Sequence, residues 1–63
     1  MFKEYRIKRG YTQEQLAELI NISWRQIQRI ENETSEPTLE TFKKIIWALQ
    51  IDDKDIIKYL KNK

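Results

Sequence analysis

The stretch that decides the fold is TQEQLAELINISWRQIQRIEN, residues 12–32. It carries the same helix-start signal twice, a hydroxyl residue followed three positions later by a glutamine: Thr12 with Gln15, and Ser23 with Gln26. In such a capping box, the hydroxyl and the glutamine side chain each accept a hydrogen bond from a backbone N–H group that a helix start leaves free. The two boxes predict short helices over about residues 13–20 and residues 24–32.

The turn between these two helices is equally informative. Only Asn21-Ile22-Ser23 separates them, and asparagine tolerates the left-handed conformation that often ends a helix. A connection this short forces the helices to cross steeply, which is the geometry of a helix-turn-helix. Apolar residues at helical spacing form the expected buried sides: Leu16, Ala17 and Ile20 in the first helix, and Ile27 and Ile30 in the second.

The second helix has an outward face with an unusual set of side chains. With about 100° between successive residues, the side opposite the two isoleucines carries Trp24, Arg25, Gln28, Arg29 and Asn32. An arginine can donate two hydrogen bonds to guanine, and a glutamine can pair similarly with adenine. An exposed indole can meet a thymine methyl group or pack along the sugar edge. We therefore expect this face to contact DNA bases; the simpler alternative is that it is merely solvated and that the indole covers a hydrophobic edge.

Three further helices complete the prediction of an all-α fold. Gly10 is expected to end a first helix over about residues 2–9, and Thr38 to cap a fourth directly after the single proline. A fifth helix begins at Asp52 or Asp53. The side chains expected to face inward are mostly apolar: Phe2, Tyr5 and Arg6 in the first helix, Leu39, Phe42, Ile45, Ile46 and Leu49 in the fourth, and Ile56, Ile57 and Leu60 in the fifth.

The composition narrows the class of protein. The chain has 63 residues and contains neither cysteine nor histidine, so it offers no disulfide, no zinc–thiolate site and no histidine base. We therefore expect no enzyme activity, no metal, no other cofactor and no small-molecule ligand. No apolar run approaches the roughly 20 residues of a membrane span, and no signal peptide is visible, which predicts a cytoplasmic location.

Charge is unevenly distributed along the chain, although the net charge is only +2. Residues 1–30 carry six Lys or Arg against three Glu, whereas residues 31–63 carry six Lys against seven acidic residues. A basic half beside an acidic half suggests one face that meets a polyanion. Helix starts also bind phosphate through free N–H groups, so contacts to the DNA backbone are expected from residues near the starts of the two capped helices: Lys8, Arg9, Thr12, Gln13 and Ser23.

Residues 12–32 resemble the helix-turn-helix of the Cro/phage-repressor (XRE-type) DNA-binding domains. The flanks fit as well, because Arg6 lies seven residues before Gln13 and Pro-Thr-Leu-Glu starts the fourth helix. The resemblance covers about residues 5–60 and implies a compact five-helix, lambda-repressor-like domain. This domain is expected over residues 1–63, with its third helix entering the major groove of double-stranded DNA.

The resemblance also implies roles for individual residues on the DNA side. Trp24, Arg25 and Arg29 match positions whose side chains reach base edges, and Gln28 lies on the same face. Gln13 matches a glutamine that touches DNA and braces the recognition helix.

Other positions match structural features of the family. Arg6 and Glu31 match a partly buried ion pair that ties the first helix to the end of the third, and Asn32 matches a residue close to phosphate. Asn21 and Glu33 stand where the family usually has glycine. Asparagine should serve there, but glutamate is unfavourable at a left-handed cap and its charge repels phosphate.

Two aromatic residues remain outside these roles. Trp47 and Tyr59 lie off the expected inward faces of the fourth and fifth helices, so they are candidates for a dimer surface or, alternatively, cover the edges of a small core. Two-fold dimers of this family reach successive major grooves about 34 Å apart.

The predicted function is that of a small transcriptional repressor of the phage or mobile-element type. It would act as a homodimer on a near-palindromic operator in the nucleoid of a prokaryotic host. The alternative is a helix-turn-helix module that binds another regulator, as antitoxins and antirepressors do. Salt separates the two, because the affinity of a DNA-binding protein falls steeply as salt rises.

Overall fold

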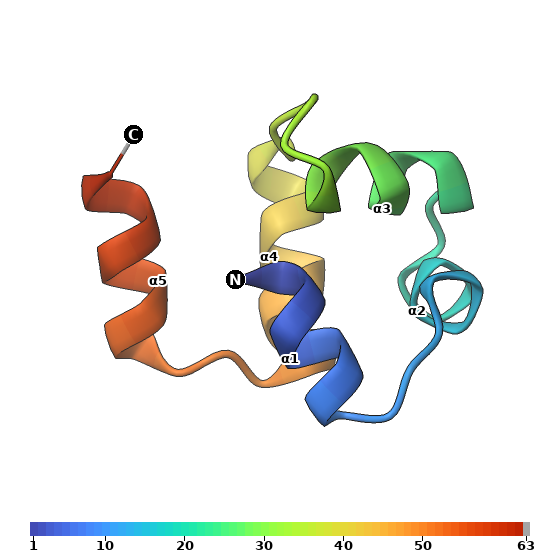
Figure 1. Ribbon diagram of the computed structural model, residues 1–63, viewed down its shortest axis with the longest axis horizontal. Coiled ribbons are helices and arrows are strands. Elements are labelled where there is room, and N and C mark those ends of the chain that lie inside the picture. Colours follow the sequence, from blue (N-terminus) through green and yellow to red (C-terminus); the bar gives the residue numbers. More distant parts are fainter. Residues whose placement is uncertain (63) are drawn as a thin grey trace.

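The computed structural model describes residues 1–62 and contains five α-helices (Figure 1): α1 (Phe2–Lys8), α2 (Gln13–Ile20), α3 (Trp24–Glu31), α4 (Leu39–Leu49) and α5 (Asp53–Lys61). This part of the chain has no β-strand, and none of its helices is long and apolar enough to cross a membrane. Of the expected domain, only Lys63 lies outside the described residues. The prediction of an all-α, five-helix fold is confirmed.

The capping signals form the helix-turn-helix as predicted. The Thr12 hydroxyl oxygen accepts a hydrogen bond from the backbone N–H of Gln15 at 3.0 Å, and the Gln15 side chain accepts one in return. Ser23 and Gln26 form the second box in the same way, with the N–H of Gln26 at 3.2 Å. Asn21 ends α2 in the left-handed conformation, with φ 58° and ψ 48°. In Figure 1, α3 runs across the view and α2 is seen almost along its axis, so the two helices cross steeply.

The core lies where α2 packs against α3 and α4, and α1 closes it by contacting α3 and α4. Its fully enclosed side chains are aliphatic: Leu16, Ile27, Ile45 and Leu49. Leu39 was wrongly expected on the buried stripe of α4 and is 69% exposed. It is the first residue of α4 and precedes the turns that send Phe42, Ile45 and Leu49 into the core.

Left-handed residues follow or cap four helix ends, and only one of them is glycine: Gly10, Asn21, Glu33 and Gln50. After α3, the backbone N–H groups of Glu33 and Thr34 turn back to the carbonyls of Ile30 and Arg29 at 3.2 and 3.0 Å. This is a Schellman turn, and it places Glu33 at φ 61°. The expected left-handed position after α3 is therefore occupied by a glutamate.

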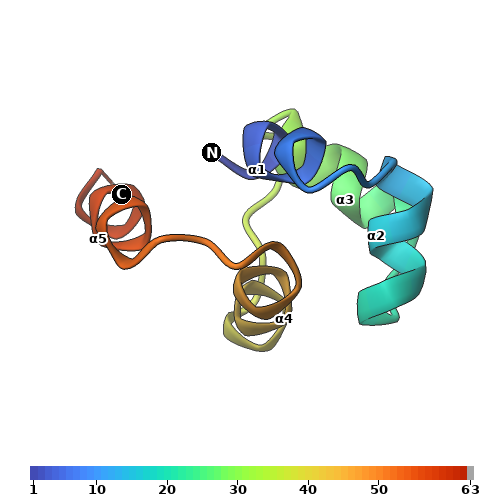
Figure 2. The same ribbon diagram turned by 90° about the horizontal axis from the view of Figure 1, so that it is seen from below.

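α5 lies beside α1 and α4, on the side away from α2 and α3 (Figures 1 and 2). Tyr5 of α1 orients its start, because the tyrosine hydroxyl donates to the carboxylate of Asp55 and accepts from the backbone N–H of Asp52 at 3.1 Å. Further along, the Tyr59 ring lies 5.2 Å from that of Phe2 and 5.5 Å from that of Phe42, measured between centroids.

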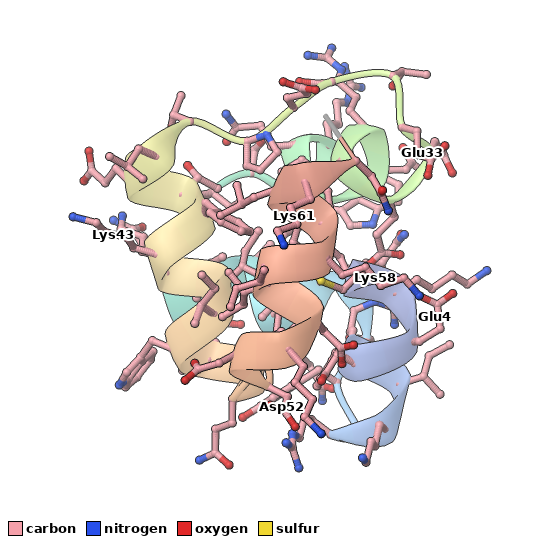
Figure 3. All side chains as sticks on the ribbon, turned by 90° about the vertical axis from the view of Figure 1, so that its left-hand side faces the viewer. Glu4, Glu33, Lys43, Asp52, Lys58 and Lys61 are labelled. Carbon is pink, nitrogen blue, oxygen red and sulfur yellow. The ribbon has the colours of Figure 1, made fainter. Side chains whose placement is uncertain are left out.

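The face that α5 turns to the core differs from the prediction. Tyr59, expected off this face, is half-buried and packs inward together with Ile56. Ile57 and Leu60, expected inward, are 52% and 56% exposed. The hydrogen bonds of Tyr5 to Asp52 and Asp55 set the rotation of α5 about its axis. This rotation places Tyr59 on the side of α5 that faces the core. Figure 3 shows α5 from outside, between α4 and α1.

Candidate nucleic-acid interface

α3 presents opposite faces to the core and to solvent. Ile27 and Ile30 are buried, whereas the Trp24 ring at the start of the helix is 42% exposed. The residues predicted for the outer face all reach the surface, Gln28 only in part: Trp24, Arg25, Gln28, Arg29 and Asn32. The structure therefore brings the predicted base-contacting side chains together on one side of one helix.

The guanidinium groups of the chain differ in whether the protein itself uses them. Arg9 donates from Nε to the carbonyl of Leu49 at 2.7 Å and from Nη2 to the carbonyl of Gln50 at 3.1 Å. It therefore caps the end of α4 with these two donors, a role within the protein that the sequence did not predict. Arg25 and Arg29 make no side-chain hydrogen bond or ion pair with any residue that the structure describes.

A continuous chain of hydrogen bonds links α1 to both helices of the helix-turn-helix. Arg6 is 8% exposed and donates to the Glu31 carboxylate from Nε at 2.7 Å and from Nη2 at 3.1 Å. Its Nη1 donates to the carbonyl of Tyr11 at 2.9 Å. Oε1 of Glu31 also accepts from Nε2 of Gln13 at 3.0 Å, and Oε1 of Gln13 accepts from Nε1 of Trp24 at 3.1 Å.

The ion pair between Arg6 and Glu31 lies at the centre of these hydrogen bonds and determines the charge of the groups that form them. The hydrogen bond to Glu31 raises the pKa of Arg6, so its guanidinium stays charged although it is buried. The expected pair between Arg6 and Glu31 is present. The bond between Gln13 and Trp24 is a contact of the bracing kind that the resemblance implies for Gln13, but the sequence did not name Trp24 as the partner.

The starts of α2 and α3 lie together, because Gln13 and Trp24 are the first residues of the two helices and are hydrogen-bonded to each other. The capping residues Thr12 and Ser23 stand directly before them. Backbone N–H groups of both first turns and the positive ends of two helix dipoles are thus concentrated in one region. Lys8 lies on the last turn of α1, and its ammonium makes no hydrogen bond to a described residue.

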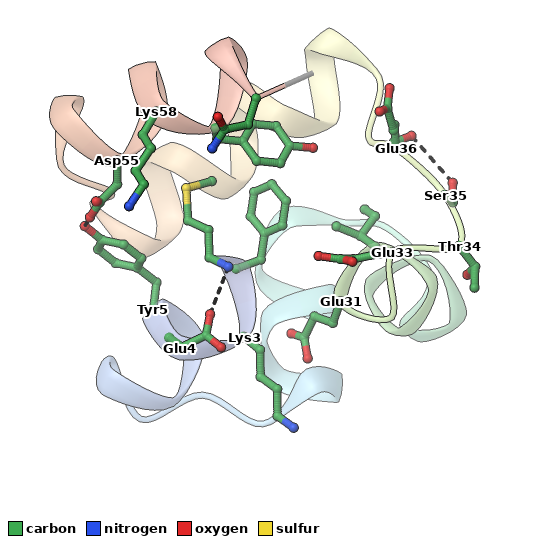
Figure 4. Close-up of a pocket in the computed structure, with 15 residues that line it drawn as sticks. Lys3, Glu4, Tyr5, Glu31, Glu33, Thr34, Ser35, Glu36, Asp55 and Lys58 are labelled. Atoms are coloured by element: carbon green, nitrogen blue, oxygen red, sulfur yellow. Dashed lines mark hydrogen bonds and ion pairs between the residues drawn. The ribbon is translucent and has the colours of Figure 1, made fainter.

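A hollow lies between α1, the loop after α3, and α5 (Figure 4). Its walls carry more carboxylates than cations: Glu4, Glu31, Glu33, Glu36 and Asp55 against Lys3, Lys58 and the N-terminal ammonium of Met1. This excess of negative charge opposes the binding of a polyanion there. Within residues 1–62, no group of three or more His, Cys, Asp or Glu side chains is placed to hold a metal ion.

The comparison with known proteins agrees with this arrangement. A family model described as helix-turn-helix matches residues 2–56, which include α1 to α4 and the start of α5. No match to the chain was found among curated proteins or among solved structures. The matched span covers most of the 63 residues and includes both capped helices and the turn between them. The chain therefore belongs to the Cro/phage-repressor (XRE-type) helix-turn-helix family of transcription regulators that bind double-stranded DNA.

Proposed function

We propose that this protein is a small transcriptional repressor that binds a near-palindromic operator as a homodimer. The observation that carries the proposal is the pair Arg25 and Arg29, which are exposed, unused within the described chain, and one helical turn apart on the face opposite Ile27 and Ile30. Two forked donors at this spacing suit neighbouring bases in the major groove.

The base contacts are assigned to the outer face of α3. Arg25 and Arg29 would donate to guanine O6 and N7, and Gln28 lies between them on the same face. Trp24 stands at the entry of the helix, where its exposed ring meets the bases or the groove wall. Each bidentate pair would contribute about 1–3 kcal/mol of discrimination against a wrong base.

The phosphate contacts are assigned to the region where α2 and α3 begin. Thr12, Gln13 and Ser23 lie at these helix starts, where free N–H groups and helix dipoles favour an anion. Lys8 supplies a free ammonium nearby, and Asn32 at the end of α3 reaches the backbone on the other side of the groove. Arg9 is left out of this set because its Nε and Nη2 donate to carbonyls at the end of α4.

The homodimer is assigned to the outer surfaces of α4 and α5. Trp47 is 70% exposed, and Ile57 and Leu60 of α5 are more than half exposed. Large apolar side chains left at the surface of a small domain favour a protein contact. Tyr59 does not belong to this surface, because its ring packs on Phe2 and Phe42. A two-fold dimer would address successive major grooves about 34 Å apart.

Selection from a random duplex library, followed by salt-dependent binding to the enriched sequence, tests the proposal. We expect a near-palindrome, with the logarithm of the affinity falling by about 0.9 per phosphate contact for each unit of log salt. Arg25→Ala and Arg29→Ala should each lose affinity while keeping the circular dichroism of the parent protein. Lys3→Ala is the matched control, because it also removes one exposed positive charge but lies on α1.

Each of three outcomes would refute a different part of the proposal. A single half-site would argue against the homodimer. Equal losses for the lysine control and the arginine variants would show a diffuse charge effect and no reading by α3. The absence of any enriched duplex, with weak binding that ignores salt, would support the alternative in which the domain binds another regulator.

A further inference from the structure

The side chain of Trp24 is polar at only one atom, and that atom is already used. The indole Nε1–H is the only hydrogen-bond donor of tryptophan, which has no acceptor. It donates to Oε1 of Gln13 at 3.1 Å. Trp24 is 42% exposed, and what its side chain offers to solvent is therefore carbon surface of the ring.

The partner amide cannot turn round to release this bond. Nε2 of Gln13 donates to Oε1 of Glu31 at 3.0 Å, and an ionised carboxylate only accepts. If the amide flipped, its oxygen would face the Glu31 carboxylate and its NH₂ group would face the indole N–H. Glu31 is in turn held by two donors of Arg6, at 2.7 and 3.1 Å. Arg6 of α1, acting through Glu31, thus fixes the orientation of the Gln13 amide and keeps the indole N–H of Trp24 hydrogen-bonded.

We infer that Trp24 is a specificity-determining residue that reads the C5 methyl group of a pyrimidine, in thymine or 5-methylcytosine, by apolar contact alone. The inference rests on the proposed entry of α3 into the major groove. There the C5 methyl group is the only apolar group that a base presents, and all other positions that distinguish the bases are donors or acceptors. An indole whose N–H is already hydrogen-bonded can form no hydrogen bond to these donor and acceptor positions. Trp24 thus differs from Arg25 and Arg29, whose donors are free.

The expected size of the effect follows from burial of one methyl group. Transfer of such a group from water to an apolar contact is worth about 0.8 kcal/mol, which corresponds to about a fourfold change in affinity. The effect should appear at one position in each half-site, near the start of α3, and other thymines of the operator should not show it.

The first test needs no DNA and compares the parent protein with Gln13→Leu. In ¹⁵N NMR spectra, the Nε1–H of Trp24 should exchange with solvent roughly two- to tenfold more slowly in the parent protein than in Gln13→Leu, as expected for one hydrogen bond. The Nε1–H of Trp47, which makes no hydrogen bond to a described residue, is the control and should exchange at the same rate in both proteins. Equal exchange rates of the Trp24 Nε1–H in the two proteins would overturn the inference.

The second test scans the enriched operator with deoxyuridine, which removes only the methyl group of thymine. One substitution per half-site should weaken binding of the parent protein about fourfold and should leave binding of Trp24→Ala unchanged. Trp24→Phe keeps an apolar ring without the N–H and should remain sensitive to the methyl group. At the same position, 5-methylcytosine should bind more tightly than cytosine.

The outcomes separate this inference from the proposed function. Failure to enrich any duplex would refute the proposed function, and the methyl reading with it. An enriched operator without a uracil-sensitive position, or with sensitivity that persists in Trp24→Ala, would refute only the methyl reading. A loss on replacing purine N7 by carbon that disappears in Trp24→Phe would show the indole donating to a base, and would also overturn it.

Discussion

Replacing Glu31 with alanine should cost far more stability than the loss of a surface ion pair. The side chain of Glu31 is 2% exposed and accepts two hydrogen bonds from Arg6 and one from Gln13. The variant leaves the guanidinium of Arg6, whose side chain is 10% exposed, with only the carbonyl of Tyr11 as a partner. Removing one member of a buried pair in this way costs about 3–5 kcal/mol.

That cost is close to the whole stability of a domain of this size. At roughly 0.05–0.15 kcal/mol per residue, a chain of 63 residues has about 3–9 kcal/mol of stability in total. Urea unfolding followed by circular dichroism should therefore show Glu31→Ala largely unfolded, or unfolding at much lower urea concentration. Its loss of DNA binding should follow the loss of structure. Glu18→Ala, which removes an exposed carboxylate from α2, is the matched control and should unfold with the parent protein.

A double variant separates the effect of leaving the Arg6 charge unpaired from the effect of losing side-chain packing at position 31. Arg6→Met with Glu31→Leu removes both charges and fills the space with apolar groups, so it should be more stable than Glu31→Ala alone. The reasoning would be refuted by a Glu31→Ala protein within about 1 kcal/mol of the parent protein. A double variant less stable than either single variant would refute it as well.

Four further substitutions test other features of the structure. Glu33→Gly should raise the unfolding free energy by about 1 kcal/mol, because it relieves a left-handed side chain at φ 61°; an unchanged or lower urea midpoint would argue against strain there. The hydrogen bond to Asp55 raises the pKa of Tyr5, so the stabilisation from this tyrosine is fully present below its unfolded-state pKa and lost as the pH rises through the folded-state value; the alkaline decline in melting temperature should be weaker in Tyr5→Phe. Arg9→Ala should lower stability by about 1–2 kcal/mol without changing the salt dependence of DNA binding, whereas Lys8→Ala should reduce that slope by about 0.9; a reduced slope in Arg9→Ala would show a phosphate contact instead.

The sequence predicts this fold well where the signals are local. Each capping box spans four residues, and Asn21 needs only its own backbone preference to end α2. The rotation of α5 is different, because Ile56, Ile57, Tyr59 and Leu60 offer more than one apolar stripe. The choice between the stripes is made by Tyr5, about 50 residues away in the chain, and by rings from α1 and α4.

The candidate site shows the same limit. Periodicity places Arg25 and Arg29 on an outer face, but a sequence does not reveal which arginines have partners inside the protein. Arg9 finds its acceptors 40 and 41 residues further along the chain, and only the fold brings them together. The bond between Gln13 and Trp24 joins the first residues of two helices whose crossing angle is set by the turn.

The attachment of α5 has a consequence for the cooperativity of folding. None of its residues is buried, and it is held to the bundle by side chains, chiefly Tyr59 on the rings of Phe2 and Phe42 and the carboxylate of Asp55 on Tyr5. Such an element can detach without melting α2, α3 and α4, so its amide protons should exchange through a partial opening that needs less free energy than global unfolding. A partner that binds only the attached form would suppress this opening by mass action. If this partner is a second copy of the chain, the protein concentration would set how often α5 detaches from α1 and α4.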